Sequence, residues 1–190
     1  MKPLKIFLCH ALEDKELVFD LYQQLKKFGA APWLDAEEIL PGQEWNFEIN
    51  KALDESDVIL LCLSKRSVSK EGYVQREIRI ALDRALEMPE GRIFLIPARF
   101  EECSLPQKIS SYQWVDLFSA NGMGKLIKSL NLRASQVDAQ PLSEGGATPI
   151  AKKSAPKQET GQEGGGINIQ GNVSGNNVII GGNNNIVNKG

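Results

Sequence analysis

The side chains able to do acid–base or nucleophilic chemistry are few in type. The chain has 190 residues and one histidine, His10. A serine or cysteine triad would have to use this histidine, and a histidine-rich metal centre cannot be built. Because His10 follows an apolar run, its simpler interpretation is a polar residue that ends a strand and bonds to the next loop. Carboxylates are the remaining candidates for catalysis.

Glycine loops of the familiar phosphate-binding types do not occur. The sequence contains neither GxGxxG nor GxxxxGK[ST], and the segment NGMGK at 121–125 does not replace them. Three acidic residues, Asp35, Glu37 and Glu38, lie close together. A solvated loop explains this run more simply than a metal site does. We therefore expect no metal and no resident cofactor.

Glu77 is the carboxylate whose position is most informative. It lies in the segment YVQREIRIAL, directly before the apolar Ile78, which places it at the edge of the buried face of a predicted helix. From this edge it would face a cleft. Tyr73 precedes it by four positions and lies on the same helical face, one turn away. The alternative is a solvated glutamate that pairs with Arg76 or Arg79.

The elements that must position these residues alternate between strand and helix. Short apolar runs predict the strands, and apolar residues at helical spacing predict the helices. The predicted strands are 4–9, 31–34, 58–63, 92–97 and 113–115, and the predicted helices are 17–28, 45–53, 74–85 and 125–132. This alternation is typical of an α/β fold with a mainly parallel sheet. In such sheets the ligand site lies at the carboxyl ends of the strands.

Two predicted loops rim the expected cleft. His10 and Ala11 begin the loop after the first strand, and Ser64 with Lys65 begins the loop after the third. Since parallel strands end at the same edge of a sheet, we expect these four residues to lie near a bound ligand.

Aromatic residues lie near the same edge. Phe7 would pack beneath a ligand, although a strand residue of this kind is more often plain core. Trp33 is either core or a wall for a ligand ring, and Trp45 is expected to anchor the second helix. Between the two tryptophans, the loop Asp35–Glu44 has the glycine and polar content of a mobile lid or an interface element.

Composition excludes several classes of partner and location. With 22 basic and 24 acidic residues and a pI near 5.6, the chain lacks the positive charge that nucleic-acid binding needs. The longest apolar run, Val58–Leu63, is far shorter than the roughly 18 residues of a membrane span, and Leu4–Cys9 is too short for a signal-peptide core. Cys9, Cys62 and Cys103 are odd in number and widely spaced. We expect a cytoplasmic protein with reduced thiols.

Two compositional changes divide the chain into three parts. Residues 1–133 carry the alternating pattern and form the expected domain. Residues 134–166 are rich in Ser, Pro, Gly, Gln and Lys without an aromatic residue, which predicts a disordered linker. Residues 167–190 alternate Gly and Asn clusters with short β-branched runs. This last part is expected to form a stacked β structure and self-associate, with a disordered tail as the alternative.

Three segments together resemble the TIR domain family over roughly residues 1–133. KIFLCHALEDKELVFDLYQQLKKFG is similar to the first strand and helix of these domains, and WLDAEEILPGQEW, with Pro41 and Gly42, resembles the loop after their second strand. ALDESDVILLCLSKRSVSKEGYVQREIRIAL is similar to the family stretch in which an aromatic residue stands four positions before a glutamate. The resemblance implies a flavodoxin-like order for a five-stranded parallel sheet with flanking helices.

The resemblance also implies an activity, because many members of this family cleave NAD+ between nicotinamide and ribose. Glu77 would then stabilise positive charge on the ribose or hold its hydroxyls, and Tyr73 would stack on a ring of the substrate. Tyr73 stands where the family often has Trp, which leaves rate and substrate choice open. NAD+ is the expected substrate, and other family members are only scaffolds.

In the family, the loop containing Pro41 and Gly42 helps to build a neighbour's site, so catalysis would depend on assembly. The tail resembles short Gly/Asn-rich amyloid-like motifs of immune effectors, and a flexible linker would raise the local concentration of domains. We therefore predict a homo-oligomer or filament that hydrolyses NAD+ in antiviral defence. The alternatives are a non-catalytic adaptor that recruits other TIR proteins and, less favoured, a receptor for a nucleotide messenger.

Overall fold

The computed structural model describes residues 1–69, 83, 94–143, 145 and 148–151. Glu77, Tyr73 and the predicted helix 74–85 lie outside these residues, apart from Asp83. The predicted Gly/Asn-rich tail 167–190 also lies outside them.

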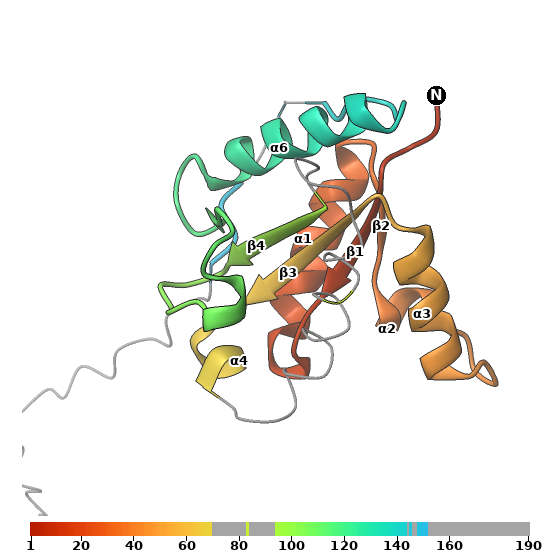
Figure 1. Cartoon of the computed structure of the whole chain (residues 1–190), viewed down its shortest axis with the longest axis horizontal. Helices are drawn as coiled ribbons and strands as arrows, with labels where there is room; N and C mark the ends of the chain where they lie inside the picture. Colours follow the sequence, from red (N-terminus) through yellow and green to blue (C-terminus); the bar gives the residue numbers. More distant parts are fainter. Residues whose placement is uncertain (70–82, 84–93, 144, 146–147, 152–190) are drawn as a thin grey trace, which may run out of the picture. The chain divides into compact units, whose positions relative to one another are not determined.

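A parallel sheet forms the centre of the described structure (Figure 1). Its five strands are β1 (Lys5–Cys9), β2 (Ala31–Trp33), β3 (Val58–Leu63), β4 (Leu95–Arg99) and β5 (Val115–Asp116). Every pair is parallel, and the order across the sheet is β2-β1-β3-β4-β5. This order confirms the flavodoxin-like α/β fold expected from the sequence.

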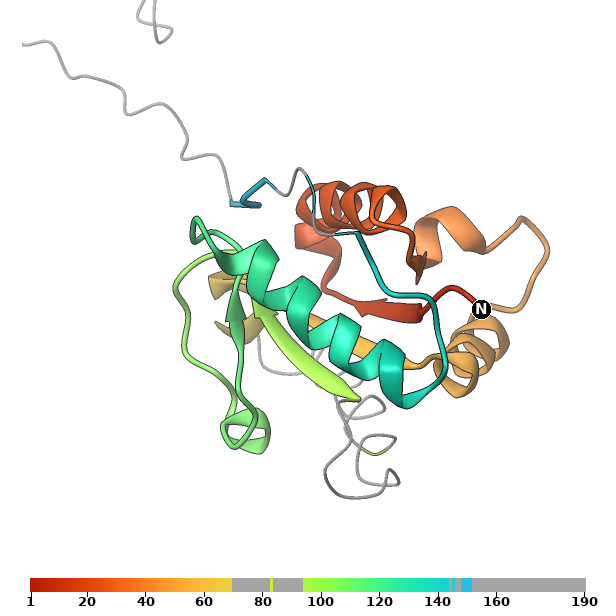
Figure 2. The ribbon, with the colours of Figure 1, turned by 90° about the horizontal axis from the view of Figure 1, so that it is seen from above.

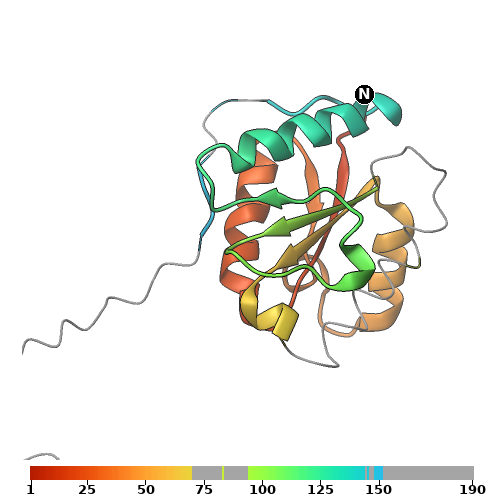
Figure 3. The ribbon, with the colours of Figure 1, turned by 60° about the vertical axis from the view of Figure 1, so that its left-hand side comes forward.

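Helices cover both faces of this sheet (Figure 3). The α-helices are α1 (Lys15–Lys27), α2 (Asp35–Glu38), α3 (Trp45–Glu55), α4 (Lys65–Ser69) and α6 (Gly122–Gln136), and the 3-10 helices are η1 (Leu12–Asp14) and η2 (Gln107–Ile109). Buried residues of α1 and α6 pack on one face, while Leu53 of α3 and Ile109 of η2 pack on the other. The molecule therefore has one apolar layer on each side of its sheet.

β3 shows why the sequence requires two layers. All six of its residues are buried, and alternate residues point to opposite faces. Val58, Leu60 and Cys62 join the layer beneath α1 and α6. The three residues between and after them join the layer beneath α3. An uninterrupted apolar run is the expected sequence of a central strand covered on both sides.

The last two strands end later than the sequence predicted. The prediction ended them at Pro97 and Val115, whereas β4 runs to Arg99 and β5 to Asp116. Charged residues are usually taken to mark strand ends, but these two are paired neighbours in the sheet. Arg99 Nε donates to Asp116 Oδ1 at 2.6 Å, so each charge compensates the other within the strands.

The domain does not end at the predicted boundary. α6 extends to Gln136, and one compact unit spans Met1–Lys153, whereas the sequence placed the boundary at residue 133. The described residues after α6, namely 137–143, 145 and 148–151, are here called the C-terminal strap. Their sequence was predicted to be linker, but the strap returns across the domain between α6 and α1 (Figure 2).

Isolated apolar residues hold the C-terminal strap in place. Ala139, Leu142 and Ile150 are each buried in the layer beneath α1 and α6. Backbone hydrogen bonds also attach the strap to the domain. The Ser143 N–H donates to Phe28 O at 3.0 Å, and the Ile150 N–H donates to Leu117 O at 3.0 Å. The polar composition of this segment led to the linker prediction, although its few apolar residues complete the core.

No helix among the described residues has the length and apolar character needed to cross a membrane.

Candidate functional site

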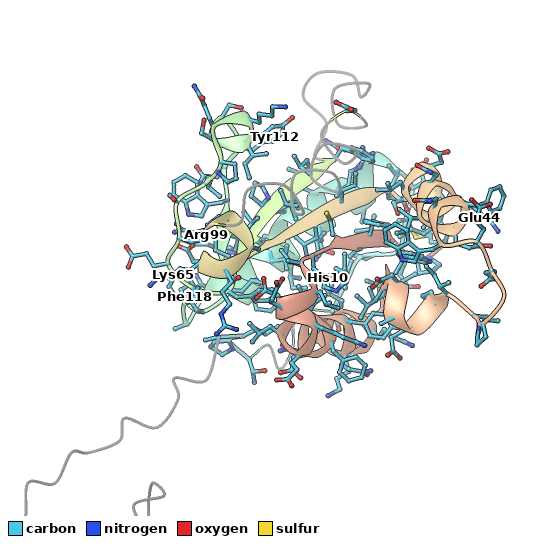
Figure 4. The ribbon with its side chains drawn as sticks, turned by 90° about the horizontal axis from the view of Figure 1, so that it is seen from below. His10, Glu44, Lys65, Arg99, Tyr112 and Phe118 are labelled. Carbon is cyan, nitrogen blue, oxygen red and sulfur yellow. The ribbon has the colours of Figure 1, made fainter. Side chains whose placement is uncertain are left out.

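The carboxyl ends of β1, β2 and β3 bring together the segments that the sequence assigned to a ligand site. β1 and β2 are neighbours, as are β1 and β3, and η1 contacts α4 beyond the strand ends. His10 and Lys65 both lie at this end of the sheet, which Figure 4 shows from below. Because strands of this fold present ligands at their carboxyl ends, this is the candidate site.

Phe7 and Trp33 form an aromatic pair at the candidate site. They are opposite each other in the β1–β2 register, and their rings stack with centroids 4.9 Å apart and an interplanar angle of 13°. Phe7 is buried within the core layer, whereas Trp33 is half-buried and also lines a groove of about 390 Å³ beside β2. Phe7 is thus a core residue, and its contact with a ligand stays a prediction.

His10 is almost enclosed, with 8% of its side chain exposed. Its Nδ1 lies 3.3 Å from Leu8 O, and its Nε2 lies 3.9 Å from Asp35 Oδ1. A neutral imidazole that donates from Nδ1 to the carbonyl presents the lone pair of Nε2 toward Asp35. These contacts are those of the simpler interpretation, in which His10 ends the strand and faces the next loop.

Asp35 is the partner that sequence reasoning did not place in the site. It begins α2, and its buried Oδ1 has no hydrogen-bond partner among the residues that the structure describes. In the tautomer that carries its hydrogen on Nδ1, the two facing atoms are both acceptors, and their separation is too long for a direct hydrogen bond. A water placed between them could donate one hydrogen to each, whereas two ligand hydroxyls would be needed to satisfy both. The sequence offered only an acidic run, which we interpreted as solvated.

Ser64 is fully buried, and its side chain hydrogen-bonds to the backbone of the next turn. Its Oγ accepts from the Ser67 N–H at 3.2 Å, and the Ser67 Oγ accepts from the Ser64 N–H at 2.7 Å. This reciprocal pair begins α4 where the sequence predicted a loop. The Lys65 N–H donates to Glu101 Oε1 at 3.0 Å. Ala11 is also buried, so Lys65 is the exposed member of the four predicted rim residues.

The predicted interface loop is a short helix followed by a turn. Pro41 and Gly42 lie at the centre of this turn, in which the Gln43 N–H donates to Leu40 O at 3.1 Å and Gly42 has φ 93°. This is a type II geometry, with Pro and Gly at their preferred positions. The side chain of Gln43 then donates to Glu48 Oε1 of α3 at 2.8 Å. The turn is exposed and does not contribute to the corner formed by His10 and Asp35.

Large apolar side chains are exposed on both sides of this turn. Leu40, Trp45 and Phe47 are 65%, 43% and 60% exposed. Trp45 is the first residue of α3 and is exposed, and its expected role as an anchor of this helix stays a prediction. Residues of this kind concentrate at protein interfaces.

Asp14 is a second carboxylate that the sequence analysis did not single out. It precedes α1 and is fully buried. Burial raises the pKa of the Cys62 thiol well above its usual value, and the nearby charges of Cys9 and Asp14 add to this effect. An Asp directly before an amphipathic helix is a recognisable N-terminal pattern, but the pattern does not reveal its burial.

No group of three or more His, Cys, Asp or Glu side chains arranged to hold a metal occurs within the described part of the chain. Tyr73 and Glu77, the predicted stacking and catalytic residues, belong to the segment that the structure does not describe. The polar corner of His10 and Asp35, beside the Phe7–Trp33 stack, is therefore the described part of the candidate site.

Comparisons with known proteins agree on the fold. The family model described as "TIR domain" matches residues 6–127. A curated relative, the uncharacterized protein y4cD of Sinorhizobium fredii (strain NBRC 101917 / NGR234), is 30% identical over 125 residues, which cover 65% of this chain and 19% of that protein. The chain thus spans about a fifth of the length of this relative.

Two solved structures are similar to the described domain. The TIR domain of the Toll-related receptor TRR-2 from Hydra magnipapillata has a TM-score of 0.54 and 18% identity, over 66% of this chain and 96% of that one. A prokaryotic SEFIR domain has a TM-score of 0.52 and 17% identity, over 75% of this chain and 99% of that one. At this level of identity the likeness shows the fold.

Proposed function

Since the chain belongs to the TIR domain family, we propose that it is an NAD+ glycohydrolase, which releases nicotinamide and ADP-ribose or a cyclised form of ADP-ribose. NAD+ is its substrate, and no cofactor is needed. Glu77 is the proposed catalytic carboxylate, and Tyr73 stacks on a ring of the substrate. The family match spans the segment that contains both residues.

The observation that supports this proposal most is the composition of the described site. The half-buried Trp33 ring, which stacks on the buried Phe7, and the polar pair His10 and Asp35 lie together at the carboxyl ends of β1 and β2. A nucleotide offers aromatic rings for stacking and ribose hydroxyls as donors, which match these groups. His10 Nε2 and Asp35 Oδ1 would each accept from a different ribose hydroxyl.

The proposed reaction needs few protein groups. When the bond between nicotinamide N1 and ribose C1′ breaks, its electron pair neutralises the cationic pyridinium ring, and C1′ gains oxocarbenium character. The Glu77 carboxylate stabilises this charge, and water then adds to C1′ and loses a proton. Because nicotinamide is a good leaving group, a second carboxylic acid is not required.

We further propose that self-association activates this enzyme. The exposed Leu40, Trp45 and Phe47 offer an apolar contact surface around the turn at Pro41 and Gly42, and the tail 167–190 would concentrate the domains. Such a cytoplasmic protein would act in bacterial immune defence by depleting NAD+ or producing a signal. Deletion of residues 167–190 is expected to reduce both oligomer size and the rate of NAD+ cleavage. Unchanged values of both would contradict this activation.

The test of the activity is nicotinamide release from NAD+ by the full-length protein at high concentration. Glu77→Ala is expected to abolish release without changing the free energy of unfolding. Glu16→Ala is the matched control, because Glu16 lies exposed in the first turn of α1 and should retain full activity. A Glu77→Ala protein that cleaves NAD+ at the wild-type rate would exclude the proposed role.

A non-catalytic adaptor is the second candidate, and the same exposed apolar residues favour it. An adaptor would bind other TIR domains through this surface without turnover. Absence of nicotinamide release from assembled wild-type protein, together with association that Phe47→Ser disrupts, would establish the adaptor. Release that requires Glu77 would establish the enzyme.

A further inference from the structure

A second groove lies away from the candidate site, between α6 and the β4–β5 edge of the sheet. Its volume is about 560 Å³, within the range of small-molecule sites. Its lining includes Ile96, Tyr112, Trp114, Val115, Lys125 and Lys128, and it reaches Leu95. Leu95 is the first residue of β4, so the groove opens at the amino end of that strand. The candidate site lies at the carboxyl ends.

The pairing of the last two strands explains the groove. β4 and β5 pair only through Ala98 with Val115 and Arg99 with Asp116. β4 begins three residues earlier, at Leu95, without a β5 partner there, and α6 lies beside β5 (Figure 3). The space left by this unequal length has an apolar floor, since Ile96 and Val115 are nearly fully buried in the layer beneath α6.

Positive charge is concentrated on the helical wall of this groove. Lys125 and Lys128 are one turn apart on α6 and both are exposed. Within the described part of the chain, neither side chain has a hydrogen bond or an ion pair. Residues three apart on a helix lie about 5–6 Å from each other at Cβ, so two ammonium groups can contact one anion.

The opposite wall holds an aromatic ring in a fixed place. Trp114 is 39% exposed, and the Arg99 guanidinium carbon lies 5.0 Å from its ring centroid. Arg99 is itself fixed, because Nε donates to Asp116 and an NH1 hydrogen donates to Cys103 O, each at 2.6 Å. Hydrogen bonding to Asp116 raises the pKa of Arg99, so the guanidinium stays charged beside the indole. A ring positioned in this way loses little entropy when a ligand stacks on it.

We propose that this groove binds a small ligand that carries a phosphate on an aromatic body, of the mononucleotide class. Lys125 and Lys128 hold the phosphate, and Trp114 with Tyr112 contacts the base above the apolar floor. An unpartnered pair of cations selects an anion, and the aromatic wall selects one with a flat ring. Among the described lining residues no carboxylate is present to repel the phosphate.

The test uses 5′-AMP, which has no nicotinamide bond, and the full-length protein carrying Glu77→Ala. Titration calorimetry and tryptophan fluorescence are expected to show saturable binding. The double variant Lys125→Glu/Lys128→Glu should weaken it at least about tenfold. Lys27→Glu/Lys51→Glu makes the same charge change at exposed positions outside the groove and should leave the affinity unchanged. Trp114→Phe should remove most of the fluorescence change.

Three results would overturn the proposal. One is an absence of saturable 5′-AMP binding at millimolar concentration, and another is equal affinity in the Lys125→Glu/Lys128→Glu variant. The third is inorganic phosphate binding as tightly as 5′-AMP, which would remove the role of the aromatic wall. Binding in the Glu77→Ala background does not depend on turnover, so loss of the proposed NAD+ activity would leave this inference standing.

Discussion

The side chain of Asn131 in α6 binds both backbone groups of Leu142 in the C-terminal strap. Its Oδ1 accepts from the Leu142 N–H at 2.7 Å, and its Nδ2 donates to Leu142 O at 3.2 Å. The amide thus replaces the neighbouring strand that would otherwise satisfy these groups. Leu142 is consequently held with its side chain buried beneath α1 and α6.

Asn131→Ala is expected to lower the free energy of unfolding by about 2 kcal/mol, because it leaves two part-buried backbone groups unpaired. Urea unfolding measures this change. Asn50→Ala is the matched control, since the Asn50 amide makes one exposed hydrogen bond, to Asn46 O. Its effect should stay within about 0.5 kcal/mol. Equal effects of the two variants would mean that the strap does not contribute to stability.

Two glycines at the start of α6 differ in their surroundings, and their substitutions should have opposite outcomes. A Cβ on Gly122 would lie 1.9 Å from the backbone oxygen of Asp116, which cannot move without disturbing β5. Gly122→Ala should therefore destabilise the domain by about 3 kcal/mol or more. A Cβ on Gly124 would meet only the Asn121 side chain, at 2.8 Å.

Because the Asn121 side chain can rotate away, Gly124→Ala should be neutral or stabilise the domain by up to about 1 kcal/mol through helix propensity. Thermal unfolding of both variants distinguishes them. A Gly122→Ala protein as stable as Gly124→Ala would show that the approach of α6 to β5 is looser than the structure describes.

The sequence predicts those parts of the fold that depend on repeated patterns. β3 was predicted with correct bounds, because a run of six consecutive apolar residues is typical of a central strand that helices cover on both faces. The strand order came from the resemblance, since periodicity alone cannot order parallel strands. The first helix was also found, because its buried residues Val18, Leu21 and Leu25 recur at helical spacing.

Features that depend on single contacts could not be predicted. Leu142 and Ile150 stand alone in a polar segment, so no periodicity marks the C-terminal strap. At the candidate site, the sequence gives no indication that Ser64 is used to begin α4 or that Asp35 faces His10. Both relationships join residues whose approach is decided by tertiary packing.

Asp35→Ala tests the polar corner of the candidate site under the proposed function. Removing the carboxylate leaves His10 Nε2 as the only acceptor of the pair, so kcat/KM for NAD+ should fall about tenfold, as expected for one hydrogen bond to a charged group. The control is Glu37→Ala, which removes an exposed carboxylate from the same helix and should retain the wild-type kcat/KM. Full activity in Asp35→Ala would exclude Asp35 from substrate binding.

The Cys62 thiol should make stability depend on alkaline pH. Burial, aided by Cys9 and Asp14, raises its folded-state pKa well above the usual value of about 9.0. In the unfolded chain the thiol ionises near pH 8.5–9, so above this pH the unfolded state binds fewer protons than the folded state. The stabilising contribution of the neutral thiol is complete below the unfolded pKa and is lost as pH rises toward the folded pKa.

Cys62→Ala removes this titration, so the stability advantage of the wild type over the variant should shrink by about 1–2 kcal/mol between pH 8 and pH 10. Urea unfolding at several pH values measures the difference. Cys103→Ala is the comparison: burial also raises the pKa of Cys103, but Arg99 opposes the rise, so its change with pH should be smaller. A wild-type advantage over Cys62→Ala that stays constant from pH 8 to pH 10 would mean that the buried thiol ionises as readily as an exposed one.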